Sequence, residues 1–105
     1  MLNDLQVFSH LLNSLPMKKP FPRILALVLW LQKADVDARE LLAKKADTSV
    51  AYLYQIAGGH RRASAELAIA LEAASKKVLA RYGALRALKR ERIAPHVRWR
   101  NYQKR

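Results

Sequence analysis

Proline positions divide this chain more sharply than any other feature of its sequence. Of the 4 prolines, Pro16, Pro20 and Pro22 are close together, and the remaining one is Pro95. Because proline lacks a backbone N–H and interrupts helices, residues 16–22 are expected to form a linker. The chain is accordingly predicted to consist of an N-terminal segment (1–22), a main domain (23–92) and a tail (93–105).

The composition favours helices. Hydrophobic residues make up 51% of the 105 residues, which is enough for one compact core. There are only 3 glycines, and β-branched residues are sparse beside alanine and leucine, a balance typical of helices rather than sheets. We predict an all-α fold of about five helices, with an N-terminal helical appendage and a basic C-terminal tail.

The segment before the prolines has the pattern of an amphipathic helix. Leu2, Leu5, Phe8, Leu12 and Leu15 recur at intervals of three and four residues, which places them on one face of a helix. Because the proline linker separates this helix from the rest, it is expected to be an appendage that mediates dimerisation or docks a protein partner.

Five helices are predicted in the main domain. In chain order they cover residues 24–33, 37–45, 50–57, 64–74 and 77–92. The first is so apolar that we expect it to be buried. Asp37 and Glu40 have the spacing of a capping box at the start of the second, and Ser49 and Ser64 are good N-caps for the third and fourth. A pair of glycines after residue 57 can end the third helix in the left-handed conformation.

Helices 37–45 and 50–57, joined by a tight turn, have the arrangement of a helix-turn-helix. Ala43 is small at the point where the two helices must cross closely. Apolar residues stand on the faces that must meet between them, namely Leu42, Ala46, Leu53 and Ile56. Together these positions predict a helix-turn-helix unit.

The stretch from Ala38 to Ser64, ARELLAKKADTSVAYLYQIAGGHRRAS, resembles the helix-turn-helix domain of Cro and λ-repressor-type regulators, especially the small phage and antitoxin-like ones. The shared features are ELLAKKA, the TSVAYLYQIAGG helix and the basic turn that leads into SAELAIALEAA. Asp47 replaces the usual glycine of the turn, although aspartate tolerates the left-handed conformation better than most residues. Thr48 replaces the usual aliphatic residue.

This resemblance implies a λ-repressor-like bundle and a cytoplasmic, sequence-specific transcriptional regulator, expected to be a repressor. Such regulators usually bind double-stranded DNA as homodimers, with the helix at 50–57 in the major groove. Base edges are expected to be read by Ser49, Ala51, Tyr52 and Gln55. Phosphates are expected to be contacted by Lys44, Lys45, Tyr54, His60, Arg61 and Arg62. For Tyr52 and Tyr54 the alternative is packing on the domain, and for the basic residues it is plain solvation.

Positive charge is concentrated toward the C-terminus. The chain has a net charge of +12, and the residues from Lys76 onward account for +10, since Glu91 is their only acid. Such an excess favours a polyanionic partner, so the region from Lys76 onward, which includes the irregular tail, is expected to bind phosphates without sequence preference. Trp99 and Tyr102 could stack on bases there. The alternatives are a disordered tail and a Trp99 that folds back onto the core.

Enzymatic activity is not expected. The chain has no cysteine, and its 3 histidines, His10, His60 and His96, lie in separate segments without metal-ligand spacing. No cofactor is predicted. The longest apolar run, residues 24–31, is far shorter than the ~20 residues that span a membrane. Two alternatives to a regulator stay open: a nucleoid-like or RNA-binding protein without sequence preference, and an antitoxin-type interaction module that binds its partner through Leu2–Leu15.

Overall fold

The computed structural model describes residues 20–83 and 85–102, and these residues form helices without any strand. The elements are α2 (Leu25–Lys33), α3 (Val36–Lys45), α4 (Val50–Ala57), α5 (Ala65–Arg81), α6 (Arg90–Ile93) and a short 3-10 helix, η1 (Trp99–Asn101). The predicted all-α fold of about five helices is confirmed. The helix predicted over Leu2–Leu15 lies outside the described residues. In the described parts of the chain, no helix is both long and apolar enough to span a bilayer.

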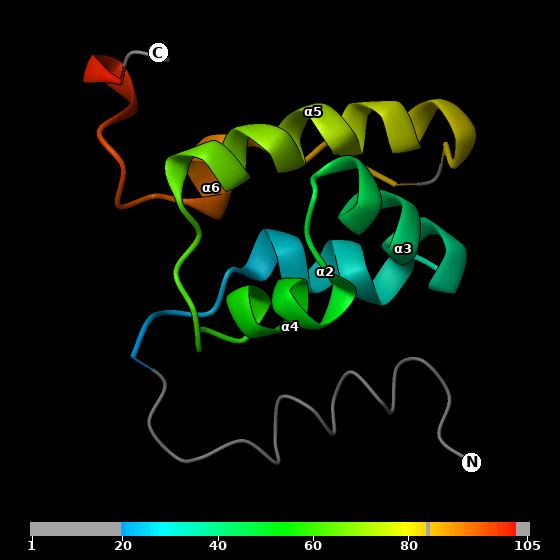
Figure 1. Ribbon diagram of the computed structural model, residues 1–105, viewed down its shortest axis with the longest axis horizontal. Helices are drawn as coiled ribbons and strands as arrows, with labels where there is room; N and C mark the ends of the chain where they lie inside the picture. Colours follow the sequence, from blue (N-terminus) through cyan, green and yellow to red (C-terminus); the bar gives the residue numbers. More distant parts are fainter. Residues whose placement is uncertain (1–19, 84, 103–105) are drawn as a thin grey trace.

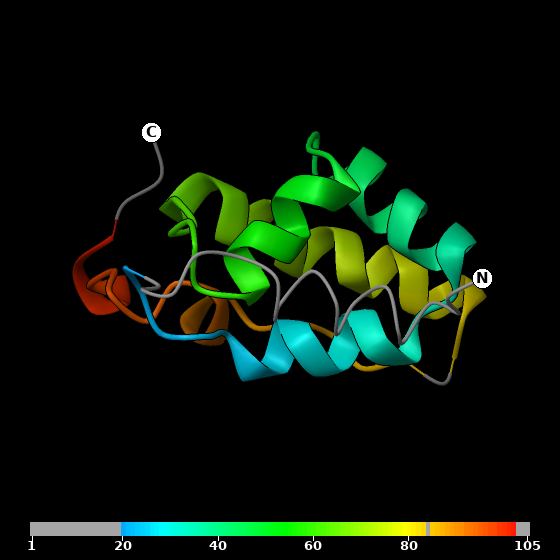
Figure 2. The same ribbon diagram turned by 90° about the horizontal axis from the view of Figure 1, so that it is seen from below.

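α5, the longest helix, runs along one edge of the molecule (Figure 1). α3 packs against both α5 and α4, and α6 contacts both α5 and α2. α4 and α2 also pack against each other and lie side by side along the molecule (Figure 2). This arrangement leaves one side of α4 and one side of α2 on the surface.

The core is built from aliphatic side chains of all five α-helices. Leu31, Leu42, Leu53 and Leu71 are 0% exposed, and Ile93 is 1% exposed. Full burial of a side chain of this size stabilises a fold by roughly 1.5–3 kcal/mol relative to an exposed position. Because each helix contributes at least one of these side chains, the packing of every helix depends on the others.

The apolar helix α2 is buried on only one side. Leu27 and Leu31 are 0% exposed, whereas Leu25 is 65% and Leu29 49% exposed. The expectation that the whole helix is buried is therefore wrong for its outer face. The reason is that α4 and α6 cover the inner face, and no described element packs over the two exposed leucines.

Serine caps determine where α4 and α5 begin. The Oγ of Ser49 accepts a hydrogen bond from the backbone N–H of Tyr52 at 3.1 Å, and the Oγ of Ser64 accepts one from Leu67 at 3.1 Å. Each bond satisfies an N–H that has no partner within the first turn of a helix. Both predicted N-caps are confirmed.

The predicted start of α3 at Asp37 is wrong. Asp35 is the N-cap, because its backbone is extended and its carboxylate accepts the N–H of Ala38 at 2.8 Å. Asp37 lies in the first helical turn instead. The sequence offers two acids two positions apart, and Asp35 is the one that follows directly on the extended residue Ala34 at the end of α2.

The predicted division of the C-terminal half into helices 64–74 and 77–92 is also wrong. α5 continues without a break to Arg81, and none of the described residues between 82 and 89 is helical. In the second half of the predicted fifth helix, only residues 90–92 are helical among those described, and they are the first three of the four residues of α6.

Two long-range hydrogen bonds account for the non-helical course of residues 85–89. The indole N–H of Trp30 donates to the carbonyl oxygen of Arg86 at 2.9 Å. The Oγ of Ser75, a fully buried residue of α5, accepts the backbone N–H of Leu88 at 2.8 Å. These bonds satisfy backbone groups that a helix would otherwise pair internally.

Residues 93–102 continue the fold. Ala94 is 0% exposed, and its carbonyl oxygen accepts the indole N–H of Trp99 at 2.9 Å. The hydroxyl of Tyr102 donates to Glu66 of α5 at 3.4 Å, and its ring lies edge-on to that of Trp99 at 5.4 Å between centroids. Trp99 thus folds back onto the core, which extends into residues assigned from the sequence to the tail.

Candidate nucleic-acid interface

The exposed face of α4 carries all four residues expected to read bases. Leu53, Ile56 and Ala57 point into the core, each at 0% exposure. On the other side, four residues are exposed, namely Ser49, Ala51, Tyr52 and Gln55. Their spacing of three and four positions makes them neighbours on one helix surface. α4 therefore presents a short row of hydrogen-bonding and small side chains to solvent.

The turn before α4 is fixed by backbone geometry. Asp47 has a φ of 57°, the one positive value for a non-glycine residue among the described residues. It thus adopts the left-handed conformation that aspartate was expected to tolerate at this point. The N–H of Thr48 then donates to the carbonyl of Ala43 at 2.9 Å. This bond holds the residue that follows the turn against α3, so α4 begins in a fixed orientation relative to α3.

The turn after α4 depends on Gly59. Its φ is +87°, and a side chain there would collide with the carbonyl oxygen of Phe21. The N–H of Phe21 in turn donates to the carbonyl of Gly59 at 3.0 Å. Gly58, by contrast, has a right-handed φ of −80°, so only the second glycine of the predicted pair is needed for its left-handed conformation.

The basic turn at residues 60–62 is anchored on Gln55. The backbone N–H groups of His60 and Arg61 both donate to its carbonyl oxygen, at 2.9 and 3.2 Å. The Nε–H of Arg61 also donates to its side-chain oxygen at 3.4 Å. The guanidinium of Arg62 stacks over the ring of Phe21 at 4.6 Å, an interaction that orients the charge without neutralising it. Arg61 and Arg62 are therefore exposed but positioned.

Two residues expected to contact phosphates point toward the domain. Tyr54 is half-buried and packs against the core, so of the two tyrosines it is Tyr52 that remains on the surface. His60 is also half-buried, and its Nε2 is buried without a hydrogen-bond partner among the described residues. In this conformation that nitrogen does not face solvent.

Of the two lysines that precede α4, only one lies next to the residues expected to read bases. Lys44 and Lys45 are both exposed at the end of α3, where positive charge also complements the helix dipole. Lys44 lines a shallow hollow of about 380 Å³ together with Ser49. Lys45 does not line it.

Two further arginines adjoin the basic turn; the sequence carries no expectation of DNA contact for Arg23, and it places Arg92 only within the basic region from Lys76 onward. Arg23, before α2, and Arg92, in α6, line a hollow of about 660 Å³ together with Arg61 and Arg62. Desolvation lowers the pKa of His96 beside them, the charge of Arg62 lowers it further, and a hydrogen bond with the backbone of Ala63 opposes both effects. No local pattern could have predicted this cluster, because its members come from three distant parts of the chain.

No protein-family model matches this chain, and no curated protein and no solved structure shows significant similarity to it. The likeness to Cro and λ-repressor-type regulators therefore stays a prediction, and a function has to be argued from the side chains and their geometry.

Proposed function

We propose that this protein is a cytoplasmic transcriptional regulator, a repressor, that binds double-stranded DNA with α4 in the major groove. The observation that carries the proposal is the exposed row Ser49, Ala51, Tyr52 and Gln55, on a helix with exposed cations at both ends. Serine can bond several base edges, glutamine can pair with adenine through two hydrogen bonds, and an alanine methyl can meet that of thymine.

The spacing of the cations also suits a duplex. α4 has 8 residues, and a helix of that length extends about 12 Å, close to the ~12 Å width of the major groove. Lys44 and Lys45 precede this helix, and Arg61 and Arg62 follow it. The two pairs can therefore face phosphates on the two strands that border the groove.

The remaining positive charge supports affinity rather than specificity. Each phosphate neutralised by a lysine or arginine releases counterions, which makes binding tighter and strongly dependent on salt. We expect homodimers on half-sites spaced roughly 34 Å apart, or a multiple of it.

A second candidate, nucleic-acid binding without sequence preference, is favoured by one observation. The net charge of +12 would hold any duplex at low salt whatever residues α4 presents. The two functions differ in what survives when the salt concentration is raised.

The test begins with selection of binding sites from a random pool of DNA duplexes. The selected duplex and a shuffled duplex of equal length are then titrated at about 50 mM and about 200 mM salt. A preference for the selected duplex that persists at the higher salt supports the regulator. Selection that yields no common sequence, with equal binding that collapses as salt rises, supports the second candidate.

Two variants assign the roles within the interface. Gln55→Ala is expected to weaken discrimination at one base position by ~1–3 kcal/mol, because one bidentate contact is lost. Arg61→Ala is expected to weaken binding to all sequences alike and to reduce the salt slope by about one. The assignment of α4 fails if Gln55→Ala leaves discrimination unchanged.

A further inference from the structure

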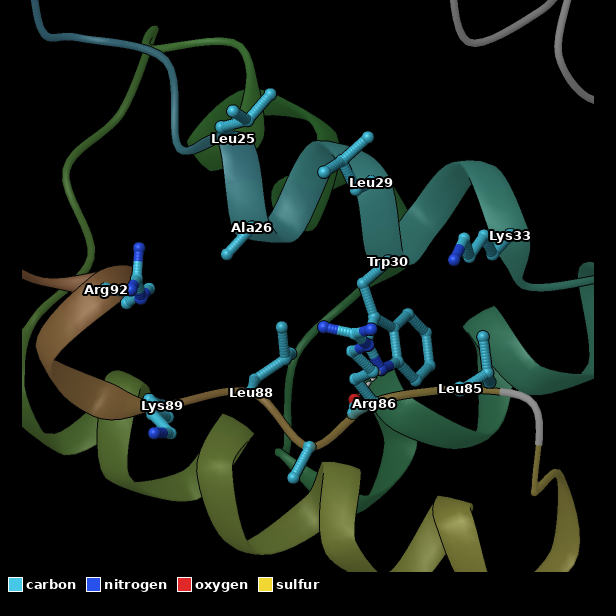
Figure 3. A pocket seen from close by; sticks show the side chains of 11 residues that line it. Leu25, Ala26, Leu29, Trp30, Lys33, Leu85, Arg86, Leu88, Lys89 and Arg92 are labelled. Carbon is cyan, nitrogen blue, oxygen red and sulfur yellow. Dashed lines mark hydrogen bonds between the residues drawn. The ribbon is translucent and has the colours of Figure 1, made fainter.

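A second surface with a different character lies between α2 and residues 85–92. It is a groove of about 580 Å³ (Figure 3), and its lining includes no residue of α4 or of the basic turn, although it shares Leu25, Ala26 and Arg92 with the hollow beside that turn. Leu25, Ala26 and Leu29 line it from α2, and Leu88 lines it from the opposite wall. Apolar side chains therefore line both walls of the groove.

Two apolar residues of this groove are exposed to an unusual degree. Leu25 and Leu29, one helical turn apart on α2, are 65% and 49% exposed. Clustered exposed aliphatic side chains mark binding surfaces more often than scattered ones do. Nothing in the described part of the chain covers them.

Positive charge surrounds these apolar side chains. The lining includes four cations, Lys33, Arg86, Lys89 and Arg92, and no aspartate or glutamate. All four are exposed, and among the described residues none of them forms an ion pair. The rim therefore favours a ligand with negative charge at its edges.

The walls of the groove are held without a ligand. The Trp30–Arg86 hydrogen bond joins α2 to the opposite wall at 2.9 Å. Below that wall, the guanidinium of Arg90 pairs with the carboxylate of Glu72 at 3.0 Å, and the Arg90 backbone N–H donates to the same carboxylate at 3.0 Å. A preformed surface loses less conformational entropy when a partner binds.

We propose that this groove binds an acidic amphipathic helix of a partner protein. The apolar face of such a helix would cover Leu25 and Leu29, and its flanking carboxylates would face the four cations. A nucleic acid would leave the leucines uncovered, since phosphates need hydrogen-bond donors and bases stack on aromatic faces. A second copy of the chain would bring its own positive rim against this one. The proposal goes beyond DNA binding and does not depend on it.

The test uses the full chain and a fluorescein-labelled peptide with leucines at positions i, i+3, i+4 and i+7 and glutamates on both flanks. A scrambled peptide of the same composition has the same charge but no apolar face. Fluorescence anisotropy is expected to show binding of the patterned peptide about tenfold tighter than that of the scrambled one, a factor that corresponds to about 1.4 kcal/mol.

Matched variants locate the binding surface. The double variant Leu25→Gln/Leu29→Gln is expected to lose the preference for the patterned peptide. Val36→Gln should retain it, because Val36 is also 47% exposed but lies outside the groove. Lys89→Glu is expected to weaken binding severalfold, whereas Lys77→Glu, an exposed position on α5 outside the groove, should not.

Four results would overturn the proposal. Equal binding of the two peptides would show that net charge alone, and not the apolar face, accounts for peptide binding. Binding that appears only in the full-chain variant Leu5→Gln/Phe8→Gln would make the N-terminal segment the occupant. A loss of dimers in the Leu25→Gln/Leu29→Gln variant, measured by sedimentation, would make it a second copy. Weaker DNA binding by that same variant would make the groove part of a nucleic-acid surface.

Discussion

The start of α4 and the C-terminal segment, residues 85–102, are held in place by different kinds of hydrogen bond. At the start of α4 the bonds join near neighbours, such as Ser49 and Tyr52, which are 3 positions apart, whereas at its end the backbone N–H of Phe21 donates to the distant carbonyl of Gly59. In the C-terminal segment they join distant residues: Trp30 and Arg86 are 56 positions apart, and Glu66 and Tyr102 are 36 apart. The turn before α4 and its first helical turn can thus adopt their geometry early, whereas the C-terminal segment depends on α2 and α5 being packed already. We expect it to open first under native conditions.

The largest effect is expected where the two regions share one core. Leu53→Ala removes a side chain of α4 that is 0% exposed, and it should lower the free energy of unfolding by about 2–5 kcal/mol. Leu25→Ala makes the same chemical change at a position that is 65% exposed, so it should alter that free energy by no more than about 0.5 kcal/mol. Urea denaturation measures both, and similar losses for the two variants would contradict the burial described above.

Gly59 lies just after α4 and Gly83 just after α5, and the two positions should respond differently to substitution by alanine. Gly59→Ala is expected to cost at least about 1–3 kcal/mol, because it combines a left-handed φ of +87° with a collision against Phe21. At Gly83 an added Cβ would have no atom within 4 Å, so Gly83→Ala should be neutral or stabilise the fold by up to ~1 kcal/mol. The two thermal midpoints provide the comparison, and a stabilising Gly59→Ala would refute the close approach to Phe21.

Ser75→Ala tests the long-range bonding of the C-terminal segment. The substitution leaves the buried N–H of Leu88 without its partner and should lower the free energy of unfolding by about 1–3 kcal/mol. Amide hydrogen exchange should become faster at Leu88 and remain unchanged in α4. The control Ser64→Ala removes a local cap at a similar cost of about 0.5–2 kcal/mol, but it should leave the Leu88 amide protected. Unchanged exchange at Leu88 in Ser75→Ala would count against this account.

The smallest effect concerns acid stability of the same segment. Burial raises the pKa of Glu72, but hydrogen bonds from the backbone and guanidinium of Arg90, with its charge, outweigh burial and place the pKa below the ordinary value of 4.5. The ionised carboxylate therefore stabilises the fold above about pH 4.5, and this contribution is lost as the pH falls through the lowered pKa. Because Arg90 is 38% exposed, we expect less than about 1 kcal/mol.

Urea midpoints measured across this pH range provide the check. Glu72→Gln should remove this part of the acid destabilisation, whereas Glu40→Gln, at an exposed position of α3, should leave the pH profile of the parent protein unchanged. Parallel profiles for the parent protein and Glu72→Gln would show that the ion pair does not contribute.

What could be predicted from the sequence is the part of the fold that short-range chemistry decides. Ser49 and Ser64 are caps because a hydroxyl next to a helix start can reach the free N–H groups there. The alternation of buried Leu53 and Ile56 with exposed Tyr52 and Gln55 follows from helical periodicity. For the same reason, the four residues expected to read bases do lie on one exposed face of α4.

The prediction of a fifth helix over residues 77–92 is wrong because local helix preference and tertiary contacts favour different structures there. Residues 77–92 are rich in alanine, leucine, lysine and arginine, which all favour helices. Trp30 and Ser75 instead bind backbone groups of Arg86 and Leu88, and no local pattern reveals that these partners meet.

The sequence by itself determined the helical class, the bounds of α4 and the polar row on its surface, since each depends on residues within a few positions of one another. Only the tertiary structure decided that Arg23 and Arg92 join the basic turn and that Trp99 anchors residues 93–102. It also decided that no described residue covers Leu25 and Leu29, which lie beside four cations. These features depend on which distant segments pack against each other, because the burial of a side chain is set by its neighbours in space and not by its own chemistry.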